Sequence, residues 1–317
     1  MMEQAQVFSQ SPEDLEEVLN LLGDKEVYTA PRTLYVVATP IGRIVDISVR
    51  AVKVLQKVDL IAAEDTRRTY ILLNILGLQK KVVSNQKFNE HQKVAVFLDA
   101  LREGKSVAVV SDAGTPCISD PGNELVKGAL SEGFDVVPVP GACAAVSGAS
   151  VSGFDLTSFL FCGFFPKENR DRKKELARLQ SGAAPTYIYY ESPKRIFDTM
   201  EILATAVPDA RLCLCNDLTK THEKFYRGTP AEVLDQLHDN PKAQKGEFTL
   251  IVSLTPQAKE KEKTAPVSPE SALVEAMLAG APTLRDATEA LLSRADNRFK
   301  KNELKMASIR LKHLFAE

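Results

Sequence analysis

Residues 109–122 read VVSDAGTPCISDPG, an apolar run followed by a loop rich in glycine, proline and aspartate. Helical spacing resumes at once in NELVKGALSEG (123–133). Open α/β sheets bind ligands where a strand enters a helix through such a loop, because backbone without bulky side chains can approach a small molecule closely. The simpler alternative is a tight turn, since glycine and proline also punctuate ordinary connections. The stretch therefore predicts an α/β fold, with a ligand loop and a plain turn as the two interpretations.

The sequence around this stretch continues the same alternation. Short apolar runs predict strands at 33–40, 59–66, 82–86, 106–112 and 135–141. Helical spacing appears between them at 46–58, 91–102 and 123–132. Strands that alternate with helices form a parallel sheet covered on both faces. We therefore expect a first α/β domain over residues 33–152.

The pattern changes after Gly153, where the apolar runs become richer in aromatic residues. Strands are predicted at 158–165, 186–190, 211–217, 223–228 and 247–254, and helices at 170–180, 194–206 and 230–238. These elements predict a second α/β domain, residues 153–254, with a mixed sheet. A polar linker (255–270) and a small helical module (271–317) are expected to follow. An acidic extension (1–32), with a helix predicted from Ser11 to Gly23, precedes the first domain.

Composition places the chain among globular proteins. It has 317 residues, 44% of them hydrophobic, which is enough to bury the cores of about two domains. It has no apolar run of membrane-spanning length and no secretory or transit signal, so we expect a cytoplasmic protein without a membrane partner. Five cysteines without a CxxC pair indicate reduced thiols and predict neither a disulfide framework nor a metal site.

Charge is distributed unevenly along the chain. Residues 1–30 contain seven acidic residues and one lysine, a net charge of −6, which leaves +4 on the remainder because the total is −2. Basic clusters occur at 166–174, 191–195 and 297–313. Such clusters are typical of solvated surfaces, and three of them in one chain also fit a partner with a phosphate backbone.

The common phosphate and hydrolase motifs are absent. No GxGxxG follows a strand, and the GxxxxG spacing at 148–153 is not followed by lysine and serine or threonine, as a P-loop requires. The stretch GASVS (148–152) lacks the last glycine of a nucleophile elbow, and His222-Glu223 lacks the second histidine of a zinc protease. Hydrolase, kinase and zinc-protease functions are therefore not supported.

A set of motifs remains, each at an expected strand end. They are ATPIG (38–42), AAEDTRRT (62–69), SDAGTP (111–116), VPGAC (139–143), YESPKR (190–195), LTKTHE (218–223) and KGEFTL (245–250). In this order they resemble the motifs of the tetrapyrrole (corrin/porphyrin) methylase family, and within it the group that methylates small-subunit ribosomal RNA. The resemblance covers residues 33 to about 254, and the helical module resembles the C-terminal module of many members.

This resemblance implies two α/β domains with S-adenosylmethionine in the cleft between them, in a homodimer. It also implies 2′-O-methylation of a cytidine ribose in the 16S RNA of the small ribosomal subunit. The loop 111–116 would then contact the methionine part of the cofactor, with Asp112 as a counter-charge or hydrogen-bond acceptor. The cofactor-binding residues implied are Pro40, Asp112, Ala113, Gly114, Thr115, Pro116, Pro140, Gly141, Tyr190, Gly246 and Glu247.

The chemistry of such a transfer also points to particular residues. A methyl group passes from sulfur to oxygen in line, so much of the rate comes from holding donor and ribose together. A sugar hydroxyl is a weak acid, and an acceptor for its proton helps. The candidate acceptors are Glu64, Asp65 and Glu223. Adjacent carboxylates beside arginines also occur in ordinary surface ion networks, so both interpretations of AEDTRR stay open. The candidate RNA contacts are Arg67, Arg68, Arg195, Lys220, Lys300 and Lys301.

Several positions depart from the pattern of the family. Arg43 replaces asparagine after TPIG, PGACA (140–144) replaces PGPSA, and NDLTK (216–220) replaces RELTK, so contacts to cofactor and RNA can differ here. Two alternatives therefore remain. One is a methyltransferase for a tetrapyrrole or another small molecule, which would have little need of the helical module or the basic clusters. The other is an RNA-binding protein that kept the fold and lost turnover.

Overall fold

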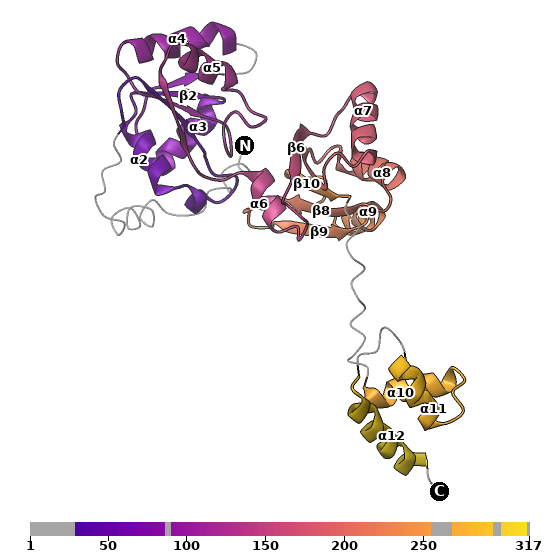
Figure 1. Ribbon diagram of the computed structural model, residues 1–317. Helices are drawn as coiled ribbons and strands as arrows, with labels where there is room; N and C mark the ends of the chain where they lie inside the picture. The colour runs from indigo at the N-terminus through magenta and orange to yellow at the C-terminus, as the bar shows by residue number, and fades with distance from the viewer. Residues whose placement is uncertain (1–28, 86–89, 255–267, 294–298, 316–317) are drawn as a thin grey trace. The chain divides into compact units, whose positions relative to one another are not determined.

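The computed structural model describes residues 29–85, 90–254, 268–293 and 299–315. It divides into two compact units, residues 1–255 and 256–317, and each is described here by itself (Figure 1). The predicted helix at 11–23, most of the acidic extension and most of the predicted linker lie outside the described residues. No helix in the described part of the chain is long and apolar enough to cross a membrane.

The first sheet is fully parallel, as the alternation of strands and helices predicts. Its strands run in the order β3-β2-β4-β1-β5. They are β1 (Thr33–Val37), β2 (Leu60–Ala63), β3 (Val82–Ser84), β4 (Val107–Val110) and β5 (Asp135–Val139). Helices α2 (Val49–Lys57) and α3 (Thr66–Ile75) pack on one face. Helices α4 (Glu90–Arg102) and α5 (Asn123–Ser131) pack on the other.

The neighbouring strands β1 and β4 send their chains to opposite faces of this sheet. The chain continues from β1 through the 3-10 turn η2 (Ile44–Asp46) into α2, and from β4 into α5. A ligand crevice forms at the carboxyl ends of two such strands, because the connections diverge and leave space between them. The stretch 109–122 begins at this point.

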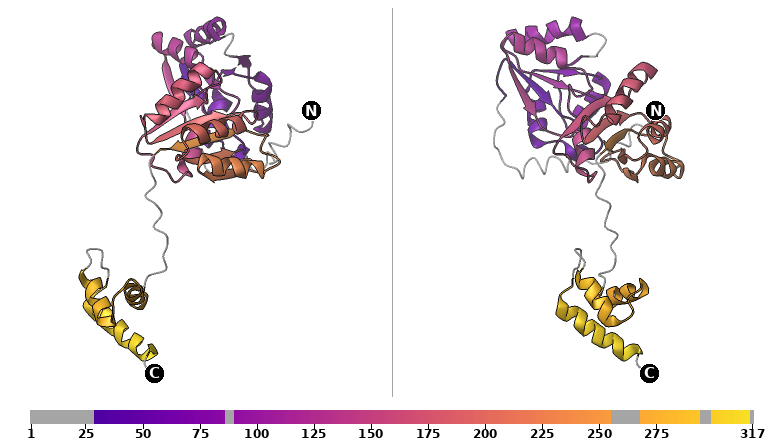
Figure 2. Two further views of the ribbon diagram at one scale, coloured as in Figure 1. Left: turned by 90° about the vertical axis from the view of Figure 1, so that its right-hand side faces the viewer. Right: turned by 45° about the vertical axis from the view of Figure 1, so that its right-hand side comes forward.

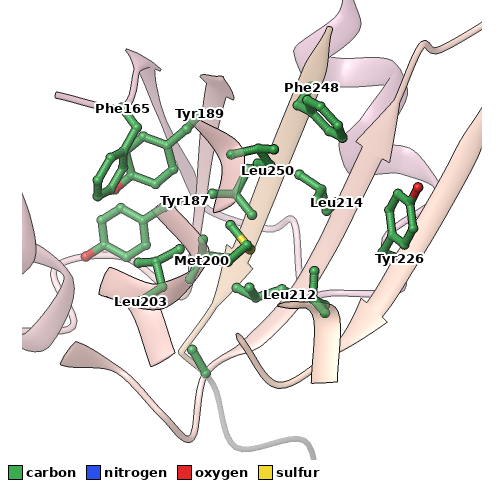
Figure 3. Close-up of a cluster of buried hydrophobic side chains, with 14 of the residues drawn as sticks. Phe165, Tyr187, Tyr189, Met200, Leu203, Leu212, Leu214, Tyr226, Phe248 and Leu250 are labelled. Atoms are coloured by element: carbon green, nitrogen blue, oxygen red, sulfur yellow. The ribbon is translucent and has the colours of Figure 1, made fainter. Parts of the chain in front are cut away.

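The second sheet is mixed, also as predicted. It has the order β6-β7-β10-β8-β9, in which only the β6–β7 pair is parallel. The strands are β6 (Phe159–Phe164), β7 (Thr186–Glu191), β8 (Arg211–Asn216), β9 (Lys224–Gly228) and β10 (Phe248–Ser253). Helices α7 (Asn169–Gln180), α8 (Ile196–Ala206) and α9 (Pro230–His238) cover one face, over the aromatic and aliphatic core in Figure 3. Helix α6 (Ala144–Ser150) packs on the opposite face.

Two helices of this unit were not predicted from the spacing. Helix α6 is short and made of small residues, so it lacks the alternating apolar face that marks a helix in sequence. Helix α3 begins inside the AEDTRR motif, which we expected to be a loop. The Asp65 carboxylate accepts the backbone N–H of Arg67 at 2.9 Å and so caps this helix.

The second unit is a bundle of three helices, in agreement with the expected helical module. They are α10 (Pro269–Leu278), α11 (Leu284–Ser293) and α12 (Lys301–Phe315) (Figure 2). A small core holds them together, with Leu273, Leu304 and Ala307 fully buried. Glu270 and Arg310 form an ion pair between α10 and α12.

Candidate functional site

The loops after β1 and β4 are fastened to each other at the carboxyl edge of the first sheet. Thr39 and Gly114 exchange two backbone hydrogen bonds, of 2.9 and 3.0 Å. The Thr39 hydroxyl also donates to the carbonyl of Ser111 at 3.3 Å. Gly114 has φ +82°, and an added Cβ would lie 3.3 Å from a methyl group of Ile41. The centre of the 111–116 loop is thus held in a conformation that favours glycine.

A cavity of about 490 Å³ opens beside this loop and takes residues from both sheets. Among the predicted cofactor residues, it is lined by Asp112, Ala113, Gly114, Thr115, Tyr190, Gly246 and Glu247. The Tyr190 hydroxyl accepts the backbone N–H of Ala145 at 3.2 Å, and its ring packs edge-on against Phe161 and Phe164. Burial raises the pKa of Tyr190, so this hydroxyl stays neutral. The fold therefore gathers six of the seven motifs around one cavity, all except LTKTHE.

A second cavity, of about 270 Å³, lies at the loop after β1. Pro40 lines it, together with Thr39 from the same loop and Lys220 from the β8–β9 connection. The two cavities share Ile41, Arg68, Asp112, Ala113 and Glu247. They therefore adjoin at these residues, and below they are called the larger and the smaller cavity.

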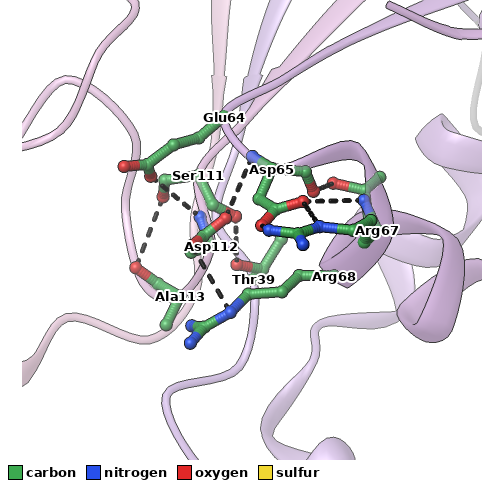
Figure 4. A network of polar contacts seen from close by, with 9 residues as sticks. Thr39, Glu64, Asp65, Arg67, Arg68, Ser111, Asp112 and Ala113 are labelled. Carbon is green, nitrogen blue, oxygen red and sulfur yellow. Dashed lines mark hydrogen bonds and ion pairs between the residues drawn. The ribbon is translucent and has the colours of Figure 1, made fainter. Parts of the chain in front are cut away.

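A polar network links the ends of β2 and β4 where the cavities adjoin (Figure 4). The Asp112 N–H donates to Oε2 of Glu64 at 3.2 Å, and the Asp65 N–H donates to Oδ1 of Asp112 at 3.1 Å. Arg68 Nε lies 3.5 Å from Oδ2 of Asp112. Burial raises the pKa values of both Glu64 and Asp112, which makes these carboxylates more basic than usual. Glu64 lines the larger cavity and so reaches the site.

Asp65 and Glu223, the other two predicted proton acceptors, line neither cavity. Asp65 receives Nε and Nη2 of Arg67 at 3.1 and 2.7 Å. These hydrogen bonds hold the pKa of Asp65 down at about 2, far from that of a useful base. Glu223 is exposed and accepts the backbone N–H of Thr219 at 2.8 Å. Of the three candidates, Glu64 alone lines a cavity, and its raised pKa suits a proton acceptor.

Asp120 is a residue of the site that the motifs did not assign. It lines the larger cavity with Glu64 and Asp112. Burial, with the nearby Glu64 charge acting in the same direction, raises the pKa of Asp120 to about 7. The loop that carries it has left-handed backbone at Cys117 and Ser119, with φ of 69° and 70°. Such strain concentrates at functional sites. The ISDPG letters contained this aspartate, but its burial cannot be seen in a sequence.

The predicted RNA contacts fall into different environments. Arg68 and Lys220 line the smaller cavity. The side chain of Arg67, which precedes Arg68, is 87% exposed. Arg195 instead pairs at 2.5 Å with Glu191, whose carboxylate is fully buried, and donates to the carbonyl of Phe165 at 2.7 Å. Its contacts are those of a residue that supports the fold. Lys300 and Lys301 are exposed residues of the second unit.

Three of the predicted cofactor residues, Pro116, Pro140 and Gly141, line neither cavity. Other residues of the same loops, such as Thr115 and Cys143, do line the larger cavity. No group of three histidine, cysteine, aspartate or glutamate side chains within the described ranges could hold a metal ion. The site is thus built from carboxylates, aromatic rings, backbone and two cations.

The model of one family, Tetrapyrrole (Corrin/Porphyrin) Methylases, matches residues 33–234, which is more than half of the chain. This protein belongs to the tetrapyrrole methylase family. A solved structure of cobalt precorrin-4 methyltransferase, a cobalamin biosynthetic enzyme, supports the fold. It superposes with a TM-score of 0.50 at 21% identity and covers 69% of this chain and 94% of that one.

Curated relatives of this tetrapyrrole methylase carry the name "Ribosomal RNA small subunit methyltransferase I". The protein of Halalkalibacterium halodurans is 44% identical over 220 residues, 69% of this chain and 75% of the relative. That of Neisseria meningitidis serogroup B is 43% identical with the same coverage. The protein of Thermotoga maritima is 40% identical, and the alignment takes in 97% of it but 69% of this chain.

The departures from the family pattern lie at or beside the two cavities. Cys143 lines the larger cavity at the start of α6, and the carbonyl of Ala142 accepts the Thr115 hydroxyl at 3.0 Å. Arg43 donates its backbone N–H to the Thr219 hydroxyl at 3.2 Å. The amide of the buried Asn216 donates to the carbonyls of residues 245 and 247, at 3.3 and 3.4 Å. At the altered positions, residues 43 and 142 thus form hydrogen bonds through their backbone, and Asn216 forms them through its side chain.

Proposed function

We propose that this protein methylates the 2′-hydroxyl of a cytidine ribose in small-subunit ribosomal RNA, with S-adenosylmethionine as the methyl donor. The observation that carries the proposal is the pair of adjoining cavities, one rich in carboxylates and one lined by Arg68 and Lys220, in a chain at least 40% identical to proteins named ribosomal RNA small subunit methyltransferase I. The larger cavity suits a cationic methyl donor. The smaller cavity suits a phosphate-bearing methyl acceptor.

The larger cavity fits S-adenosylmethionine by its chemistry. A ligand with a positive sulfur and an ammonium group favours nearby carboxylates, and Glu64, Asp112 and Asp120 line this cavity. Its volume of about 490 Å³ is in the range of small-molecule sites. The aromatic rings of Phe164 and Tyr190 add apolar wall for a nucleoside. These residues, with the backbone of 113–115 and 246–247, would hold the cofactor.

The smaller cavity fits a nucleotide better than a macrocycle. Lys220 from the β8–β9 connection and Arg68 from helix α3 both line it, and each can donate to a phosphate oxygen. A tetrapyrrole is much larger than the sugar of one nucleotide, and the cavity holds about 270 Å³. The small-molecule alternative is therefore the weaker one for this chain.

The carboxylates of the larger cavity provide the base for the reaction. When bound, the cofactor supplies an electrophilic methyl group on a positively charged sulfur. Transfer of that methyl group to the ribose oxygen would require the hydroxyl proton to leave. Glu64 and Asp120 are both half-buried and both have raised pKa values, so either carboxylate can accept it. Arg68 and Lys220 hold the RNA in place for that step.

The helical second unit serves as an accessory in this proposal. The relative from Thermotoga maritima has almost no chain outside the 220 aligned residues, so a protein with that name exists without much of what this chain adds. We propose that Lys300 and Lys301 increase the affinity for RNA from this unit. Homodimer formation and the cytoplasmic location remain predictions.

The test is methyl transfer from labelled S-adenosylmethionine. Small ribosomal subunits that lack the modification are incubated with the full chain and the labelled donor, in parallel with a tetrapyrrole acceptor. The proposal expects label in the 16S RNA and none in the macrocycle. Label in the macrocycle alone would establish the small-molecule function. Binding of cofactor and subunits without transfer would establish a non-catalytic RNA-binding protein.

A further inference from the structure

The connection between β8 and β9 contains a departure from the family pattern that the proposed function does not explain. Asp217 stands there where the pattern has glutamate, three residues before Lys220. Its backbone is left-handed, with φ +53°, a conformation that aspartate and asparagine tolerate better than other side chains. The position thus combines an uncommon backbone with a charged side chain beside the smaller cavity.

Asp217 is held by the start of β10. Its N–H donates to the carbonyl of Glu247 at 2.9 Å, and its Oδ1 accepts the N–H of Glu247 at 3.2 Å. Its carbonyl accepts the N–H of Lys220 at 2.9 Å, which closes the turn. The Asp217 backbone is therefore held by contacts to Lys220 and Glu247, and its carboxylate by the Glu247 N–H.

Gly246 makes the room for this carboxylate. A Cβ at residue 246 would lie 2.1 to 2.4 Å from the three carboxyl atoms of Asp217, far inside contact distance. Gly246 also has φ +86°. The glycine of the KGE motif is thus matched to the aspartate on the neighbouring strand end.

Lys220 sits between two carboxylates of unequal exposure. Its Nζ lies 2.6 Å from Oδ1 of Asp217 and 3.1 Å from Oε2 of Glu247. The Asp217 side chain is 21% exposed, whereas that of Glu247 is 72% exposed. Burial acts in the opposite direction, but the two carboxylates raise the pKa of Lys220, and the ammonium stays charged. An exposed pair of this kind contributes little and exchanges readily.

We infer that Asp217 is a positioning residue that holds the Lys220 ammonium in the smaller cavity, while Glu247 is a counter-ion that an RNA phosphate displaces. This inference rests on the proposed function. A free lysine side chain samples many rotamers and loses that freedom on binding. Because Asp217 fixes the side chain beforehand, phosphate binding avoids most of this loss.

The experiment compares Asp217→Ala, Lys220→Ala and the double variant in the full chain. We expect each single variant to raise KM for the small subunit roughly tenfold, with kcat and S-adenosylmethionine affinity unchanged. Each should also reduce the slope of affinity against salt by about one phosphate contact. The double variant should be no worse than Lys220→Ala, because Asp217 acts through Lys220.

Two further variants separate positioning from loss of structure and from general charge. Asp217→Asn keeps the left-handed preference and the Oδ1 acceptor, so KM should return to within about threefold of the wild type. Asp171→Ala removes another aspartate three residues before a lysine, since Asp171 lies 3.2 Å from the exposed Lys174. This matched control should leave KM unchanged.

Additive effects in the double variant, or an unchanged KM in Asp217→Ala, would overturn the inference. Subunit binding is measured beside turnover so that the two claims can be told apart. If the wild type binds subunits but transfers no methyl group, the proposed catalytic function fails. The positioning role is then still decided by the effect of Asp217→Ala on subunit affinity and its salt slope.

Discussion

The larger and the smaller cavity share one wall and differ in the charged residues that line their other walls. Beyond the shared residues, Glu64 and Asp120 line the larger cavity, and Lys220 lines the smaller one. Loops at the edges of the two sheets thus create adjoining sites that differ in their balance of charge. Changes in the larger cavity should therefore affect cofactor binding or turnover, whereas changes in the smaller cavity should affect RNA affinity.

The largest effect is expected from Gly114→Val, in the wall of the larger cavity. A β-branched side chain resists the φ of +82° and meets Ile41, so the cofactor loop must move. We expect S-adenosylmethionine affinity, measured by titration calorimetry, to fall by at least about 100-fold, which is a few kcal/mol. Gly133→Val is the matched control, because Gly133 has φ +73° with no neighbour within 4 Å. A normal affinity in Gly114→Val would remove the loop from the cofactor site.

The next effect concerns the carboxylates of the larger cavity. The double change Glu64→Gln with Asp120→Asn should reduce kcat by about 10²- to 10⁴-fold, since the one carboxylate of raised pKa left there, Asp112, is engaged by Arg68 and by the Asp65 N–H. Asp65→Asn, outside the cavities, should have the smaller effect. Single-turnover rates with saturating cofactor and subunits provide the measurement. A larger effect of Asp65→Asn would instead indicate that Asp65, paired with Arg67, accepts the proton.

The raised pKa of Asp120 predicts opposite pH dependences of activity and stability. The base must be ionised, so kcat should fall as pH decreases through about 7, and Asp120→Asn should remove this step. A carboxyl group whose folded pKa is raised stabilises the fold in its protonated form, and that contribution is lost as pH rises through about 7. Asp120→Asn should therefore raise Tm at pH 8 relative to the wild type and much less at pH 5. Equal Tm differences at both values would contradict the assigned ionisation.

A moderate effect is expected from the cations of the smaller cavity. Arg68→Ala should raise KM for subunits roughly tenfold, because the guanidinium lines the cavity where a phosphate would lie. Arg67→Ala is the matched control on the same turn of α3, with a side chain 87% exposed and paired with Asp65. Steady-state kinetics at several salt concentrations separate the two variants. Equal changes would mean that surface charge, not the cavity, attracts the RNA.

The smallest effect should come from the second unit. Changing Lys300 and Lys301 to alanine should weaken subunit binding by about two- to fivefold and flatten its salt dependence. Cofactor affinity should stay the same. Arg285→Ala is the control, because Arg285 is an exposed cation on a different helix of that unit, α11. An unchanged salt slope would leave this unit without a part in RNA binding.

Much of the fold could be predicted from the sequence because its signals are local. Strands of the first sheet are short apolar runs, and β2 and β4 are buried along their whole length, as central parallel strands are. Helices α3 and α6 were not predicted because one starts within a polar motif and the other consists of small residues. Element type could therefore be predicted where a continuous apolar run or an amphipathic pattern existed.

The candidate site was less predictable because proximity and burial depend on tertiary structure. The acidic pair Glu64 and Asp65 is adjacent in sequence, yet one carboxylate turns into the larger cavity and the other caps a helix. Asp120 belongs to the site because its loop folds back over the sheet edge, and Arg195 is bound to a buried glutamate. Residues of the same type thus have different roles, because the tertiary structure gives them different neighbours.

The most direct test of the two-cavity account is the identity of the methylated nucleoside. Subunits lacking the modification are treated with the full chain and S-adenosylmethionine, and the 16S RNA is digested to nucleosides for mass spectrometry. The account predicts 2′-O-methylcytidine from the wild type, little of it from the Glu64 and Asp120 double variant, and a normal amount from Lys220→Ala at saturating subunit concentration. A methyl group on the base, or full 2′-O-methylation by the double variant, would contradict it.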